Sequence, residues 1–400
     1  MTDTKPIDRA GTPQNRRTIL LLSLGHFAND AYPGFLAPLQ PLLMQQAHYG
    51  LTLAGVLTSI ASISGSIMQP FFGLWSDRMR RPWLVIGGPL VTALLFGTIG
   101  WWHSWYALAA IILIGGLGSA AFHPQAAALS GKAGQRRSGL AMSLFVTGGN
   151  AGHALGPLII LSVVSLWGLH SSMVTAVLGV AVAFLLWKQL PPHIDPGAAE
   201  GRNPVPWSRE ERRRLGSLVL IWLVVVLRSF IVSGFMTFCP IYLTSKGYSI
   251  LTAGGANTLF EISGAFGSIL GGALSDRIGR KEVIVLSMAG AFPAFWLFLH
   301  GGSLIAPVML ALAGFFIYSS ISVNIVMGQA LFPRQAGAIS SLMMGMGWGL
   351  GGLAVTPLGA MAERYGVGAA LNALIFVTLA GLLAALLIRP GQPTVKQQEA

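Results

Sequence analysis

The sequence GLWSDRMRRP at residues 73–82 returns in altered form as GALSDRIGRK at residues 272–281. Other landmarks repeat at nearly the same offset of 199 or 200 residues, namely Pro41 with Pro240 and Pro157 with Pro357. One near-constant offset over several landmarks indicates a duplicated unit that fills about half of the chain.

Composition places both units in a membrane. The 400 residues are 53% hydrophobic and 10% charged, whereas a soluble domain carries roughly a quarter charged residues. Apolar runs of spanning length fall at 17–44, 52–76, 83–102, 105–130, 138–166, 169–190, 214–244, 250–275, 282–300, 303–331, 335–363 and 367–389. They predict an all-α membrane protein with twelve transmembrane helices in two pseudo-symmetric six-helix bundles.

Basic residues predict the topology. If the N-terminus is cytoplasmic, only Lys246 and Arg364 fall on the other side, and Arg228 lies within a helix. This bias predicts that both termini are cytoplasmic. The expected parts are a tail at 1–16, a bundle at 17–190, a Pro-rich linker at 191–213, a second bundle at 214–389 and a tail at 390–400.

The same observations exclude other classes of protein. The net charge of +12 follows from the topology, so a nucleic-acid partner is not expected. Cys239 is the only cysteine, which excludes an internal disulfide. No nucleophile elbow, phosphate-binding glycine–lysine loop or Cys/His cluster occurs, so we expect no enzyme, no metal and no cofactor.

The repeated motif resembles the loop signature of the major facilitator superfamily. The copy at 272–281 is complete, whereas the first has Arg80 where glycine is usual. A finer resemblance, to the fosmidomycin-resistance branch, is carried by GHFANDAYPGFLAPLQPLL (25–43), AFHPQAAALSG (121–131) and TGGNAGHALGPL (147–158). It implies a proton-driven efflux pump of the inner membrane that works by alternating access.

The repeated loop can act as a cytoplasmic latch between helices, because its carboxylate can bind a helix N-terminus and its arginines are forked donors. Topological anchoring by positive charge is the alternative. The predicted gating residues are Gly73, Asp77, Arg78, Arg81, Gly272, Asp276, Arg277 and Arg280.

Few ionisable side chains lie at membrane depth, where such groups usually mark a pathway or relay. They are His26, Asp30, His123, His153, Arg228 and Glu261. Asp30 shares a helix face with His26, which makes it a candidate proton or substrate site; a permanently fixed pair with His26 or Arg228 is the alternative. His123, next to Pro124, is either functional or a structural donor to a freed carbonyl.

Arg228 lies within one residue of the position equivalent to Asp30 in the second unit. It can bind an anionic group or neutralise Asp30. As a hypothesis, substrate anion and proton compete for this pair. Glu261 is expected to be a second protonation site or a salt-bridge partner of Arg228.

The remaining predictions concern packing and the cavity. Gly148, Gly152 and Gly156 form a small-residue stripe that favours close helix packing. The residues expected to line a substrate cavity are Asn29, Tyr32, Asn150, His153, Phe235, Tyr242, Asn257, Tyr318 and Trp348.

The sequence therefore predicts a secondary transporter, acting as a monomer, that exports a small polar or amphipathic compound in exchange for protons. Proton-coupled uptake of a small organic anion is the alternative within this class. A non-transporting receptor is the alternative from another class, and it would need a soluble domain or long loops.

Overall fold

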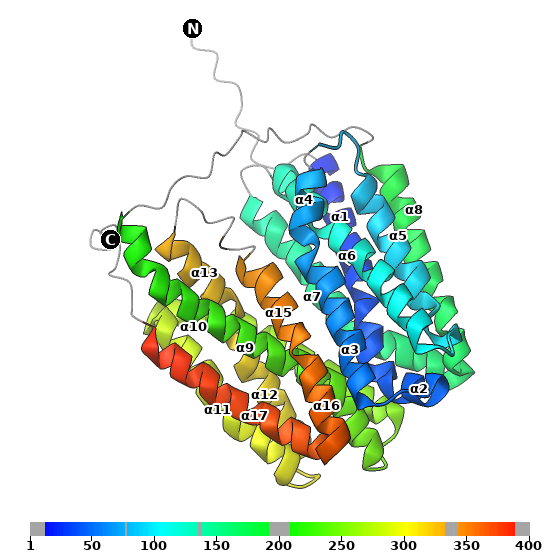
Figure 1. Cartoon of the computed structure of the whole chain (residues 1–400). Helices are drawn as coiled ribbons and strands as arrows, with labels where there is room; N and C mark the ends of the chain where they lie inside the picture. The colour runs from blue at the N-terminus through cyan, green and yellow to red at the C-terminus, as the bar shows by residue number, and fades with distance from the viewer. Residues whose placement is uncertain are drawn as a thin grey trace.

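A computed structural model describes residues 13–76, 78–134, 138–191, 209–332, 339 and 342–388, and within these ranges the chain is helical with no strand. Figure 1 shows two bundles side by side, α1 to α8 in blue to green and α9 to α17 in green to red. This arrangement confirms the all-α fold class.

The first bundle consists of α1 (Pro13–Ala31), η1 (Pro33–Phe35), α2 (Leu36–Ala47), α3 (Leu51–Ser62), η2 (Ile63–Ile67), α4 (Gln69–Ser76), α5 (Trp83–Gly97), η3 (Ile99–Trp101), α6 (Trp105–Gly134), α7 (Ser138–Trp167), η5 (Leu169–Thr175) and α8 (Ala176–Gln189). The second consists of α9 (Arg209–Ser245), α10 (Ile250–Ile278), α11 (Arg280–His300), α12 (Ala306–Ser319), α13 (Ile321–Leu331), η7 (Leu342–Met346), α15 (Gly347–Leu353), α16 (Val355–Tyr365) and α17 (Val367–Leu387).

Nine helical segments in the described ranges are long and apolar enough to cross a membrane, fewer than the twelve predicted spans. The predicted spans without such a segment are 17–44, 250–275 and 335–363. Pro33 interrupts the first, between α1 and α2, and Asn257, Thr258 and Glu261 lower the hydropathy of the second. The third is divided into short helices, and α9 begins at Arg209, inside the predicted linker.

The two motif copies fold differently. Gly279 ends α10 with φ of +109°, and α11 begins at the next residue. Residues other than glycine rarely adopt this backbone conformation. The equivalent Arg80 is not among the described residues with positive φ, and the chain there remains outside helices from Met79 to Pro82. The first copy, which has arginine in place of this glycine, therefore has a longer break between its two helices.

The glycine stripe of α7 packs against α1, as predicted. A methyl group on Gly148, Gly152 or Gly156 would collide with a backbone carbonyl oxygen of α1. Only glycine lets the two backbones approach this closely. This contact holds α7 against the part of α1 that carries His26 and Asp30.

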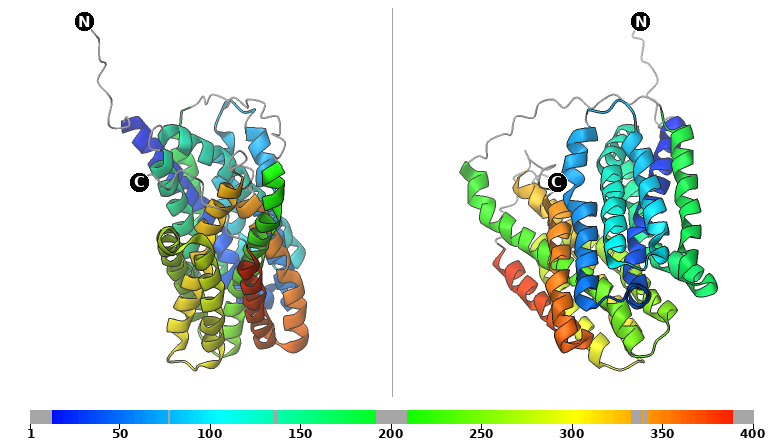
Figure 2. Two further views of the ribbon diagram at one scale, coloured as in Figure 1. Left: turned by 90° about the vertical axis from the view of Figure 1, so that its left-hand side faces the viewer. Right: turned by 45° about the vertical axis from the view of Figure 1, so that its right-hand side comes forward.

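The bundles diverge towards the end at which α1 and α9 begin, and they converge at the opposite end, called here the far end (Figures 1 and 2). At the far end Thr58 Oγ1 lies 3.0 Å from Thr237 Oγ1, and Ser59 Oγ lies 2.8 Å from Thr356 Oγ1. Glu363 Oε2 accepts a 3.0 Å hydrogen bond from the Thr52 amide, at the N-terminus of α3. Such a carboxylate is favoured by the helix dipole. These contacts close the far end.

Gly359→Ala is expected to weaken this closure. The added methyl would lie 2.5 Å from Leu51 O and 3.1 Å from Thr52 Cα, so α16 must move away from α3. Thr58→Cys should then react several-fold faster with a membrane-impermeant maleimide. Buried Cys239 gives little background.

The control for this variant is Gly87→Ala in α5, where a methyl meets nothing within 4 Å. Unchanged labelling in the Gly359→Ala background would show that the α3–α16 contact does not control access.

Candidate functional site

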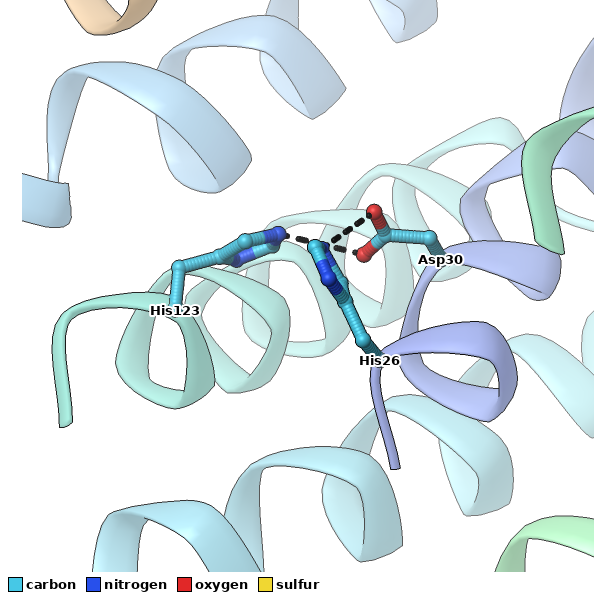
Figure 3. Close-up of side chains that lie close together, drawn as sticks. All are labelled: His26, Asp30 and His123. Atoms are coloured by element: carbon cyan, nitrogen blue, oxygen red, sulfur yellow. Dashed lines mark ion pairs between the residues drawn. The ribbon is translucent and has the colours of Figure 1, made fainter. Parts of the chain in front are cut away.

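Asp30 lies one residue before the end of α1 and is only 6% exposed. Figure 3 shows the imidazoles of His26, from α1, and His123, from α6, directed at its carboxylate. His153, from α7, is the third histidine near it. We call these four residues the Asp30 cluster.

Both carboxylate oxygens of Asp30 are occupied. Oδ1 lies 3.2 Å from His123 Nε2 and accepts a 2.9 Å hydrogen bond from Asn29 Nδ2. Oδ2 lies 3.1 Å from His26 Nε2 and 3.6 Å from His153 Nε2. Asn29 also donates to Ser119 Oγ at 3.0 Å, so it is a positioning residue of the cluster.

The other nitrogen of two imidazoles fixes where the protons lie. His26 Nδ1 is 2.7 Å from Phe145 O, and His123 Nδ1 is 2.8 Å from Ser119 O. Carbonyl oxygens only accept, so both Nδ1 atoms carry hydrogen. Each Nε2–carboxylate hydrogen bond then needs a proton of its own, on the imidazole or on the carboxylate. The observed geometry is therefore that of a cluster holding two protons more than its fully deprotonated form.

Donor atoms of His26, Asp30 and His123 lie within 4.8 Å of one another, a spacing that could also suit a metal ion. The two Nε2–carboxylate contacts are at hydrogen-bond length, 3.1 and 3.2 Å. His123 Nδ1 donates to the carbonyl oxygen of Ser119. The carbonyl without a helical donor is that of Ala120, because Pro124 has no N–H to donate to it. His123 therefore does not satisfy that freed carbonyl.

Arg228 is the matching charge in the second bundle, on α9. It is 2% exposed, and its guanidinium lies 5.3 Å from the ring centre of Trp348. Its Nε and Nη1 have no hydrogen-bond partner, and among the described residues Asp30 is paired only with histidines. The predicted Asp30–Arg228 and Glu261–Arg228 pairs are thus not formed in this structure.

Glu261, from α10, and Tyr318, from α12, are both partly buried in the second bundle. Glu261 forms no ion pair within the described ranges.

The other predicted cavity residues occupy different environments. Asn150 and His153 have exposed side chains on α7. Asn257 is buried and its side-chain amide donates to Met236 O. Tyr242 is partly buried, and Lys246 Nζ lies over its ring.

Two residues do not fit their prediction. Tyr32 is 1% exposed and its hydroxyl is held by Thr175 O and the Gly179 amide, while Phe235 packs against three other phenylalanines. Both lie inside their bundles, because their rings are apolar enough to join the core.

The described residues of the predicted latch are mostly exposed. Asp276 is exposed and makes no ion pair within the described ranges, and Asp77 lies outside them. Arg78, Arg81 and Arg277 are exposed, Arg280 is partly buried, and Arg81 lies over Trp83. Gly73 faces Pro124, and Gly272 faces Ser322.

Sequence reasoning missed Gly149 and Ser119. A methyl on Gly149 would collide with His26 Nε2 and lie 2.8 Å from Asp30 Oδ2. The only sequence signal for Ser119 is its place one helical turn before His123.

Comparison with known proteins identifies the family of the chain. The family model of the Major Facilitator Superfamily matches residues 22–356. The chain is 30% identical to the fosmidomycin resistance protein of Escherichia coli (strain K12) over 378 residues, 90% of each chain. It is 27% identical to the multidrug resistance protein MdtG of Dickeya zeae (strain Ech586), over 71% of each.

Solved transporter structures share the fold. A bacterial homologue of the human lysosomal transporter Spinster, inward-facing and occupied, superposes with a TM-score of 0.77 at 16% identity, covering 95% of this chain and 97% of that one. The nucleoside transporter NupG gives a TM-score of 0.71 at 14% identity, covering 94% of this chain and 98% of that one.

Proposed function

Because the chain belongs to the Major Facilitator Superfamily, we propose that it is a proton-coupled antiporter of the inner membrane that exports a small polar or amphipathic organic compound. Alternating access between the two bundles is the proposed mechanism, with the termini in the cytoplasm and one chain as the working unit. The efflux and resistance proteins among its relatives support export.

The observation that carries the proposal is the buried Asp30 carboxylate with the Nε2 atoms of His26 and His123 at 3.1 and 3.2 Å. The groups that face Asp30 are His26 and Asn29 from α1, His123 from α6 and His153 from α7. Ser119 from α6 accepts the second hydrogen bond of Asn29. A passive facilitator would not need ionisable groups at membrane depth, which are costly to bury there.

Loss of protons gives the cluster a reason to change shape. If one of these two protons leaves, no hydrogen lies between one imidazole nitrogen and the carboxylate oxygen opposite it. The lone pairs of the two atoms then repel each other. That contact must open or bind another donor. Because His26, His123 and His153 come from three helices, deprotonation would loosen the packing of α1 against α6 and α7. We propose that this links proton release to the movement of the bundles.

Proton-coupled uptake of an organic anion is the second candidate. Arg228 favours it, because its buried guanidinium has donors free for an anion. Transport in proteoliposomes under an imposed pH gradient distinguishes the two. Export predicts that substrate moves against the direction of the protons, whereas uptake predicts movement with them. Movement that ignores the gradient would contradict both.

A further inference from the structure

We propose that Arg228 binds a compact anionic group, a carboxylate or phosphate, on the transported compound. This inference rests on the proposed transport function, but it holds for either direction of transport. It assigns the second bundle to substrate recognition and the first bundle to protons.

The buried guanidinium lacks the partners that such a group requires. Arg228 is 2% exposed, and Nε and Nη1 have neither an acceptor nor solvent. Leaving a buried charge without partners is strongly unfavourable, so a charged donor of this kind is normally paired. A bound anion supplies both the opposite charge and the missing acceptors.

The nearby acids are not paired with Arg228. Asp30 is held by histidines of its own bundle. Neither Asp30 nor Glu261 forms an ion pair with Arg228 within the described ranges. Neither acid therefore neutralises the positive charge of Arg228 in this structure.

The surroundings of Arg228 define the class of ligand. The Trp348 ring lies over the guanidinium at 5.3 Å. A cation beside an indole ring suits an anion attached to a planar or apolar body. An organic cation would be repelled by Arg228.

Proton and substrate would then occupy different atoms. Protons sit between Asp30 and the histidines, while the anion sits on Arg228. This replaces the direct competition for one Asp30–Arg228 pair that the sequence suggested.

Calorimetric titration of the purified full chain tests the inference, with benzoate and inorganic phosphate as anionic probes and tetraethylammonium as the cationic one. We expect an anion to bind the wild type and to bind Arg228→Gln roughly 10- to 100-fold more weakly, the loss typical of a charged hydrogen bond. Arg228→Lys, which keeps the charge but loses the planar donor set, should fall between them.

Two further variants keep the test decisive. Trp348→Leu should weaken benzoate binding more than phosphate binding, even if Arg228→Gln does not fold. Asp30→Asn should still bind the anion while losing proton-driven transport, which separates this inference from the proposed coupling. Equal anion affinity in Arg228→Gln, binding of tetraethylammonium only, or no anion binding to the wild type would overturn it.

Discussion

Asp30→Asn is expected to reduce proton-driven transport to the level of protein-free vesicles. Asparagine keeps the shape of the side chain, but its amide can donate to one imidazole nitrogen without any titrating proton. The cluster then no longer needs two protons for its contacts with His26 and His123. Because the variant retains hydrogen bonds at this site, it should fold and elute as the wild type does.

Two measurements separate loss of coupling from loss of transport. Proton-driven flux should disappear, whereas exchange of labelled for unlabelled substrate without a pH gradient should persist. Glu282→Gln, an exposed carboxylate in the first turn of α11, is the matched control and should transport normally. An Asp30→Asn protein with unchanged flux and unchanged pH dependence would refute the role of the cluster.

Gly149→Ala is expected to disable the same cluster without changing any titratable group. The methyl would occupy the space between His26 Nε2 and Asp30 Oδ2, where it collides with the first and lies 2.8 Å from the second. Overpacking a tight site costs about 1–3 kcal/mol, although alanine is by itself the better helix former. We expect a lowered Tm and at least a ~10-fold loss of proton-driven flux, which corresponds to about 1.4 kcal/mol.

A matched substitution and a double variant control this experiment. Gly255→Ala in α10 adds a methyl where nothing lies within 4 Å, so its Tm and flux should remain at or above the wild-type values. In Gly149→Ala with His26→Ala the collision with the imidazole is removed, so part of the lost Tm should return while coupling does not. Wild-type flux in Gly149→Ala alone would mean that the His26–Asp30 contact is dispensable.

The two ends of the molecule differ in the contacts that close them. The far end is closed by α3 and α16, whereas Asp276 at the other end has no ion pair within the described ranges. This combination is what alternating access requires, because both ends cannot be closed by the same contacts during transport. Gating by the repeated loop remains a prediction for the conformation in which that end closes.

The sequence by itself determined the fold class and identified most of the ionisable residues of the candidate site. Length of apolar runs and the 199-residue repeat are local properties, and the cost of burying charge in a membrane makes each acid or base at depth conspicuous. Asp30, His26, His123 and Arg228 could therefore be named from residue type and position along the chain alone.

Tertiary structure decided which of these groups meet. Pairing of Asp30 with histidines from α6 and α7, and not with Arg228, depends on helix rotation and on the close approach that the α7 glycines permit. A repeat offset gives depth in the membrane but not the facing direction of a side chain. For the same reason Tyr32 and Phe235 pack inside their bundles, while Gly149, with no side chain to signal a role, sets the space in which His26 meets Asp30.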